Sequence, residues 1–234
     1  MNGIYKIAGC NIEIHSLHRD VHLLCREYCC DAPPDFVIET TQSDIEAERT
    51  HSETGTFSDG YLETLAAYRK IADRMLDYDT LLLHGSCVAV DGIGYLFTAK
   101  SGTGKSTHTR LWRECFGSRA MMVNDDKPLI RVTESGAIAY GTPWNGKHGL
   151  GENIAVPLRA ICILSRDAEN HIEPTDKNRA LPMLLQQTHR PADASGMTKM
   201  LTLTNRLANT VNLYRLGCNM ETEAAEIAYR GMKP

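Results

Sequence analysis

The segment AKSGTGKST at residues 99–107 constrains the fold of this 234-residue chain more than any other stretch. It follows the pattern Gly-x-x-x-x-Gly-Lys-Ser/Thr, with alanine in place of the first glycine. Gly102 and Gly104 let backbone N–H groups converge on an anion without a side chain in the way. The apolar run GYLFTA before the loop predicts a strand, and STHTRLW after it predicts a helix whose positive N-terminal end adds to the anion site. The sequence therefore predicts a strand–loop–helix unit that holds nucleotide phosphates.

The residues of this loop have separable expected roles. Lys105 can reach the outer phosphates, and the Ser106 hydroxyl can ligate magnesium. The alternative interpretation is a glycine-rich turn without a ligand, which the flanking strand and helix disfavour. We expect contacts to the nucleotide from Ser101, Gly102, Thr103, Gly104, Lys105, Ser106 and Thr107.

A pair of aspartates follows in the segment NDDKP at residues 124–128, at the end of an apolar strand. Asp125 comes 20 residues after Lys105, an interval that accommodates a helix and a strand. We therefore expect this strand to neighbour the one that enters the loop, with both aspartates at the sheet edge where the phosphates lie. Adjacent strand residues point to opposite faces, so one carboxylate suits magnesium and the other suits an acceptor. The alternative is a pair of aspartates that begins a turn.

The order of these features resembles that of a known family. The segments LLHGSCVAVDGIGYLFTAKSGTGKST and MMVNDDKP look like the catalytic core of HPr kinase/phosphorylase. They are also similar to the nucleotide site of ATP-dependent phosphoenolpyruvate carboxykinase. The resemblance covers residues 81–129, roughly a fifth of the chain. It implies an α/β fold, with a mixed sheet and a phosphate-loop core of the HPr kinase C-terminal domain type.

The resemblance also implies roles for single residues. Lys105 contacts phosphate, while Ser106 and Asp126 hold magnesium. Asp125 is the base that takes the proton of the acceptor hydroxyl, and His84 matches the family's active-site histidine. The alternative for His84 is a buried, hydrogen-bonded histidine at a strand end. Thr107 stands where the HPr enzyme has an acid, which disfavours HPr itself as the acceptor.

The activity implied is a magnesium-dependent kinase of the serine kinase-like type. Its expected donor is a nucleoside triphosphate, most simply ATP, and its expected acceptor is a hydroxyl, such as a serine of a protein or peptide. Three alternatives stay open: a nucleotide-binding sensor, an NTPase with water as acceptor, and a small-molecule kinase. The aspartate pair argues against a pure sensor but does not separate water from a hydroxyl acceptor.

A second glycine-rich stretch, GTPWNGKHGLGEN at residues 141–153, follows a predicted strand. Long loops in compact domains are often functional. Lys147 could meet a phosphate, and Trp144 could stack on a base or anchor a peptide. The alternative is a buried tryptophan and a solvated lysine. Arg159 and Arg166 flank the next strand and could supply charge to the transition state.

Composition excludes some classes of partner. The net charge is −4 and no block of Lys or Arg occurs, so we expect no nucleic-acid partner. No run of 18 apolar residues and no signal-peptide pattern occur, so we expect a cytoplasmic chain with no membrane partner. The cluster CREYCC at residues 25–30 lacks a second metal-binding pair, so we expect reduced thiols rather than a zinc site. A homo-oligomer is left open.

The pattern of apolar runs predicts two parts. Residues 1–59 are expected to be a small β-rich part, with a hairpin through residues 9–11 and a polar loop over residues 41–60. Residues 60–234 are expected to form the HPr kinase-like nucleotide-binding catalytic domain. It opens with an amphipathic helix at residues 61–79. Hairpins and crossovers alternate after that, which predicts a mixed α/β sheet. Pro182 is expected to interrupt one of the later helices.

Overall fold

The computed structural model describes residues 1–51 and 55–233 of the chain. It contains two compact units, Met1–Met75 and Leu76–Pro234. This division differs from the predicted boundary between residues 59 and 60, because the helix that follows that boundary packs with the helices and sheet of the first unit. No helix among the described residues combines the length and the apolar character needed to cross a membrane.

The first unit contains a small sheet of three strands, β1 (Asn2–Ile7), β2 (Cys10–His15) and β3 (Phe36–Glu39). The antiparallel strands β1 and β2 pair Ile7 with Cys10, so the predicted hairpin turns at Ala8 and Gly9. Both turn residues have positive φ, 48° and 78°, as tight hairpins require. The β3 strand runs parallel to β2. The small N-terminal sheet expected from the sequence is therefore present.

The helices of this unit are α1 (Asp20–Leu24), the short 3₁₀ turn η1 (Arg26–Tyr28), α2 (Gln42–His51) and α3 (Asp59–Met75). The α3 helix confirms the predicted amphipathic helix. The predicted loop over residues 41–60 is corrected by α2 at residues 42–51, and its residues 52–54 lie outside the described residues. The sequence of α2 shows no helical apolar pattern, because Ile45 is the one buried apolar residue of this helix. Its buried Glu48 pairs instead with Arg69 of α3, so a charged contact replaces the apolar stripe that sequence patterns detect.

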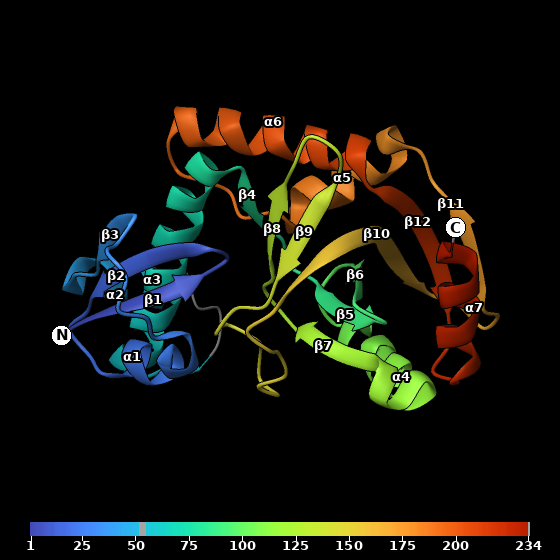
Figure 1. Cartoon of the computed structure of the whole chain (residues 1–234), viewed down its shortest axis with the longest axis horizontal. Coiled ribbons are helices and arrows are strands. Elements are labelled where there is room, and N and C mark those ends of the chain that lie inside the picture. Colours follow the sequence, from blue (N-terminus) through green and yellow to red (C-terminus); the bar gives the residue numbers. More distant parts are fainter. Residues whose placement is uncertain (52–54, 234) are drawn as a thin grey trace. The chain divides into compact units, whose positions relative to one another are not determined.

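The second unit is built on a nine-stranded mixed sheet (Figure 1). Its main order is β4-β8-β9-β10-β6-β5-β7, and β12 pairs with both β10 and β11. The strand β10 pairs in parallel with β6 and β12, and the other pairs are antiparallel, which confirms the predicted mixed sheet. The strands are β4 (Thr80–Leu82), β5 (Ser86–Val90), β6 (Ile93–Thr98), β7 (Ala120–Asn124), β8 (Leu129–Val132), β9 (Ala137–Tyr140), β10 (Ala155–Arg166), β11 (His171–Pro174) and β12 (Asn212–Cys218).

Helices cover both faces of this sheet. One apolar core lies under α5 and α6, and a second lies under α4 and α7 (Figure 1). Alternate residues of the central strands supply the two cores: Leu96 enters the first, and its neighbours Tyr95 and Phe97 enter the second. The helical elements are the 3₁₀ turns η2 (Leu76–Tyr78) and η3 (Gly117–Arg119) and the helices α4 (Lys105–Phe116), α5 (Lys177–Gln187), α6 (Ala194–Thr210) and α7 (Glu223–Met232).

Pro182 lies inside α5, which continues past it to Gln187, so the predicted interruption is wrong. Pro182 is the sixth residue of α5, so it removes one backbone hydrogen bond of the helix, and the turns on either side of it remain helical. The side chain of Asp176 caps the start of this helix by accepting from the Arg179 amide at 3.0 Å. The cap holds the helix start despite the proline.

The direction of three strands determines which residues meet. Both β6 and β7 are antiparallel to β5, so β6 and β7 run in the same direction and end at the same edge of the sheet. The expected adjacency of β6 and β7 is wrong, because β5 lies between them. The apolar segment before β6 forms two strands, β4 and β5, which are separated by residues 83–85. The consequence is that His84, the loop after β6 and the aspartates after β7 share one edge.

A buried histidine in α4 makes the stability of the fold depend on pH. Trp112 Nε1 donates to His108 Nε2 at 3.0 Å, and His108 Nδ1 has no partner in the described part of the chain. Burial lowers the pKa of His108 from 6.5 to about 3. The folded state therefore favours the neutral ring, and the stability this gives is complete above pH 6.5 and is lost as the pH falls toward 3.

We expect the free energy of unfolding to fall by about 1.4 kcal/mol per pH unit below pH 6 from this group alone. The variant His108→Gln should lose that slope, since its side chain does not titrate. The matched control is His171→Gln, at an exposed position on β11, which should keep the slope. Urea unfolding at pH 7, 6 and 5 measures how the free energy of unfolding depends on pH. Equal dependence in wild type and His108→Gln would contradict the lowered pKa of His108.

Candidate functional site

The loop between β6 and α4 has the backbone shape expected of an anion cradle. Gly102 and Gly104 adopt φ values of 78° and 121°, a region that side-chain-bearing residues rarely enter. A Cβ atom added to either glycine would meet no atom within 4 Å, so open space lies beside both. Thr103 Oγ1 closes the turn by donating to the Lys100 carbonyl at 2.9 Å.

The first turn of α4 presents donors to the same space. Its N-cap residue is Gly104, which has no side chain to cap the helix, and no acidic residue lies in the first turn. The starts of α5 and α6, by contrast, are capped by the aspartates that precede them. Ser106 is exposed and Thr107 half-buried. An uncapped helix start with exposed hydroxyl groups is suited to an anion, because its N–H groups and dipole are both available.

Lys105 is held inside the loop. The residue is buried, and its Nζ donates to the Ala99 carbonyl at 3.0 Å. Burial lowers the pKa of Lys105, against the opposing effect of the charges on Asp126 and Asp125. The ammonium group therefore lies within electrostatic reach of both aspartates at the sheet edge.

The two aspartates have different surroundings. Asp125 is buried, and its Oδ1 accepts from the Ser86 hydroxyl at 2.7 Å. Ser86 Oγ also lies 2.8 Å from the Thr109 hydroxyl of α4, within hydrogen-bond distance. A chain of three side chains thus joins the end of β7 to the first turns of α4. Asp125 is turned inward, toward the helix that follows the loop.

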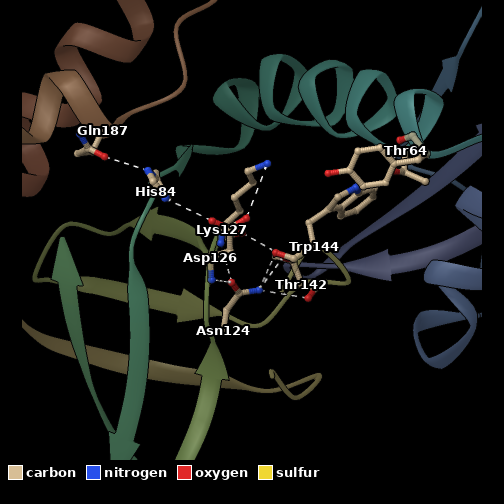
Figure 2. A network of polar contacts seen from close by, with 9 residues as sticks. Thr64, His84, Asn124, Asp126, Lys127, Thr142, Trp144 and Gln187 are labelled. Atoms are coloured by element: carbon tan, nitrogen blue, oxygen red, sulfur yellow. Dashed lines mark hydrogen bonds and ion pairs between the residues drawn. The ribbon is translucent and has the colours of Figure 1, made fainter. Parts of the chain in front are cut away.

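Asp126 is more open. Its side chain is 29% exposed, and its Oδ1 lies 3.3 Å from His84 Nε2 (Figure 2). Burial would raise the pKa of Asp126, but the hydrogen bond with His84 and the charges of Lys127, His84 and Lys105 outweigh it, so the pKa lies below its ordinary value. His84 is 34% exposed in its side chain. This carboxylate therefore stays ionised at neutral pH, beside an imidazole and accessible to solvent.

Asn124, which sequence reasoning passed over, connects this corner to the second glycine-rich loop (Figure 2). It is fully buried, and its Oδ1 accepts from the amides of Asp126 at 2.9 Å and Lys127 at 2.7 Å. Its Nδ2 donates to the carbonyl and hydroxyl oxygens of Thr142 and to the carbonyl of Trp144, at 3.2, 2.9 and 3.3 Å. One amide thus orients the turn that carries the aspartates and fixes the start of the loop beside it.

We expect Asn124→Ala to lower the free energy of unfolding by about 3 kcal/mol, because it leaves several buried polar groups without partners. The matched control is Asn209→Ala, whose single amide contact lies on the exposed side of α6 and should cost less than about 0.5 kcal/mol. Urea unfolding measures both variants. Equal midpoints for them would show that the network around Asn124 contributes nothing.

The second glycine-rich loop reaches the aspartates at Gly146. A Cβ atom placed on Gly146 would lie 3.0 Å from the Cβ of Asp126, and the residue has a φ of 75°. The segment from Trp144 to Lys147 is therefore brought beside Asp126. Trp144 is buried, and Lys147 is exposed. The contacts that these two side chains make with a ligand remain a prediction.

The two arginines considered from the sequence lie at different ends of β10. Arg166 donates from Nε to the Thr103 carbonyl at 3.2 Å and from Nη2 to the Gly102 carbonyl at 2.5 Å, so it braces the outside of the loop. Arg159 lies between residues that pair with the start of β6, at the end of that strand away from the loop. Of the two, only Arg166 is brought to the site.

The site contains too few metal-binding side chains to hold a metal without other ligands. No three His, Cys, Asp or Glu side chains within residues 1–51 and 55–233 are grouped to hold a metal ion. The eight cysteines are free thiols, and Cys25 of the CREYCC cluster is buried while Cys29 is exposed. Magnesium is commonly held by one or two carboxylates together with substrate phosphates and water. The donors that fit such an ion are the Ser106 hydroxyl and the aspartate pair.

Comparison with known proteins gives the family of the chain. The model of the family described as SynChlorMet cassette protein ScmC matches residues 60–223, and the chain belongs to this family. Among solved structures, the chain matches the Hpr(Ser) kinase/phosphatase from Coxiella burnetii with a TM-score of 0.38 and 10% sequence identity. That match covers 64% of this chain and 94% of the other. No curated protein matches the chain.

Proposed function

We propose that the chain is a magnesium-dependent kinase that transfers the terminal phosphoryl group of a nucleoside triphosphate, expected to be ATP, to a hydroxyl group of a protein or peptide. One observation carries the proposal. A glycine loop with a buried lysine and an uncapped helix start shares a sheet edge with a buried aspartate and with a second aspartate beside a histidine. The loop, the lysine and the helix start suit the nucleotide that donates the phosphoryl group. The aspartates and the histidine suit the hydroxyl that accepts it.

The donor side is supported by geometry and charge. Open space beside Gly102 and Gly104 leaves room for phosphate oxygens, and the N–H groups at the start of α4 are suited to bind them. Lys105 adds a positive charge to this cradle. Ser106 and an aspartate fit magnesium, which supplies, when bound, positive charge that offsets the charge on the phosphates. The resemblance over residues 81–129 supports the same assignment.

The surroundings of the two aspartates favour an exchange of the roles expected from the resemblance. A base must reach an acceptor that arrives from solvent, and Asp126 is the more exposed of the pair. Asp125 is buried and linked through Ser86 to α4, which suits the metal side of the site. We therefore propose Asp126 as the residue that takes the acceptor's proton, and Asp125 as the partner of Ser106 in holding magnesium.

The residues of the site then have separate roles in phosphoryl transfer. The loop amides and Lys105 hold the phosphates in place. Asp126 orients the hydroxyl and accepts its proton as the oxygen–phosphorus bond forms and the bond to the leaving nucleoside diphosphate breaks. Asn124 holds Asp126 in position through the turn, and His84 lies where it can stabilise the carboxylate or take the proton on. Catalysis of this kind is mostly positioning and charge stabilisation.

The rival activities differ in the acceptor. In an NTPase water would take the place of the hydroxyl, in a small-molecule kinase the acceptor would be a small alcohol, and a sensor would bind nucleotide without transfer. An ionised carboxylate next to an imidazole, both partly exposed, favours a site that activates an acceptor over a sensor. The family's description as a cassette protein leads us to seek the acceptor among proteins encoded beside it.

The experiment is transfer from γ-³²P-ATP with magnesium to an array of peptides that contain serine, threonine or no hydroxyl. We expect label on hydroxyl-containing peptides, dependence on magnesium, and none with Lys105→Met. Release of inorganic phosphate at the same rate with and without peptides would favour the NTPase. Bound nucleotide with neither labelled peptide nor phosphate release would favour the sensor. Either result would overturn the proposal.

A further inference from the structure

Arg166 reaches the loop between β6 and α4 from the end of the long strand β10, which lies beside β6 (Figure 1). The two strands pair in parallel as far as Ile163 and Thr98, and β10 continues to Arg166 where β6 has already ended. The strand β12 still pairs with this last part of β10, with Arg166 opposite Cys218. The sheet therefore fixes the backbone of Arg166 beside the loop.

The guanidinium group of Arg166 holds two successive peptide groups of the loop. Its Nη2 donates to the Gly102 carbonyl at 2.5 Å, and its Nε donates to the Thr103 carbonyl at 3.2 Å. In a planar trans peptide the N–H group points opposite to the carbonyl group. The amides of Thr103 and Gly104 are therefore directed away from Arg166. In agreement with this, the Thr103 amide donates within the loop, to the Lys100 carbonyl at 3.3 Å.

The order of the strands places Arg166 and the two aspartates on opposite sides of the loop. The strand β6, which enters the loop, lies between β10 and β5, and β7 lies beyond β5. Arg166 ends β10, whereas Asp125 and Asp126 follow β7. The carbonyl groups drawn toward β10 thus leave the amides on the side of the aspartates. An arginine on the β10 side is poorly placed to reach a phosphoryl group that is transferred beside Asp126.

We infer that Arg166 is a positioning residue that holds the carbonyl groups of Gly102 and Thr103 away from the nucleotide, so that the loop is shaped for phosphate before a ligand binds. A carbonyl oxygen that faced the phosphates would repel them. Glycine gives little resistance to rotation of its peptide groups, so Gly102 and Gly104 need an external contact to fix them. A loop that is competent only part of the time binds with an affinity reduced by that fraction. The inference rests on the donor side of the proposed function.

The test is calorimetric titration of the full chain with ADP and with a non-hydrolysable ATP analogue, both with magnesium. We expect Arg166→Met to weaken the binding of both by about 10-fold and by the same factor, because the loop amides hold the inner phosphates that both nucleotides share. Arg166→Lys should recover only part of the loss, since an ammonium group lacks the planar fork. The matched control is Arg159→Met, on the same strand away from the loop, which should bind as wild type does. Arg166 is exposed, so we expect its variants to fold, which urea unfolding checks.

The division of the effect between KM and kcat separates positioning from a catalytic role. In the peptide transfer assay, Arg166→Met should raise the KM for ATP about 10-fold with kcat unchanged, because the loss falls equally on the ground state and the transition state. A lower kcat, together with a larger loss of affinity for the ATP analogue than for ADP, would show that Arg166 acts on the transferred phosphoryl group. That result would overturn the inference.

A further readout needs no nucleotide. The ¹³C signals of the Gly102 and Thr103 carbonyl groups should move in Arg166→Met, which removes their donors, and should stay in place in Arg159→Met. Unmoved signals, or unchanged affinities for both nucleotides in Arg166→Met, would overturn the inference even if the wild type transfers phosphate. The expected signals and affinities in a chain that transfers no phosphate would leave the positioning role intact and refute the kinase.

Discussion

Asp126→Asn is expected to lower the rate of phosphoryl transfer by ~10²–10⁴-fold while changing nucleotide affinity little. The substitution keeps the size of the side chain and its place in the turn held by Asn124, but removes the charge that accepts the proton. A group that acts mainly in the transition state lowers turnover without weakening ground-state binding. Single-turnover transfer measures the rate, and calorimetry with magnesium and a non-hydrolysable ATP analogue measures the affinity.

The companion variant Asp125→Asn separates the two aspartates. If Asp125 is on the metal side, this variant should weaken magnesium-dependent binding and transfer together. The matched control is Glu134→Gln, an exposed carboxylate in the turn between β8 and β9, which should change neither quantity. If Asp126→Asn kept full transfer and only Asp125→Asn lost the rate, Asp125 would be the base that takes the acceptor's proton, as the resemblance implies.

Lys105→Met is expected to weaken binding of the magnesium nucleotide by ~100-fold or more. Hydrogen bonds to charged groups are each worth about 1.5–3 kcal/mol, and this lysine is the buried cation of the loop. Methionine fills a similar volume without a charge, so the fold should persist. Urea unfolding should confirm that the variant is at least as stable as wild type, because the change removes a buried ammonium group.

The control for this substitution lies in the same loop. Lys100 is exposed, and Lys100→Met should leave affinity within about threefold of wild type, since an exposed charge contributes little. Calorimetric titration of both variants measures the difference. If the two lysines have equal effects, the loop acts only through general positive charge and the cradle assignment is wrong.

The parts of the fold that were predictable are those encoded locally. The strand–loop–helix order around Gly102 and Gly104 follows from glycine punctuation between two apolar patterns, and β6, the loop and α4 appear as expected. The hairpin of β1 and β2 and the helix α3 follow in the same way from period and turn residues. The shared sheet edge of the aspartates and the loop was also predicted, because it depends on strand direction rather than on strand neighbours.

The parts that were missed depend on contacts between distant segments. Nothing near Ile45 indicates α2, because that helix packs through a charged pair with α3. The insertion of β5 between β6 and β7 is a matter of pairing, which periodicity does not encode. Gln187 is separated from His84 by 103 residues, so only the fold brings them together. Asn124 carried one local signal, its position directly before the two aspartates, where a short polar side chain can cap a turn.

The central claim is that a triphosphate binds at this sheet edge, with its terminal phosphate between the loop and Asp126. The most direct measurement is a crystal structure of the full chain with magnesium and a non-hydrolysable ATP analogue. The account predicts phosphates on the backbone of residues 101–107, with the metal next to Ser106 and an aspartate and with Asp126 facing the terminal phosphorus. A nucleotide bound elsewhere, or a metal distant from both aspartates, would contradict it.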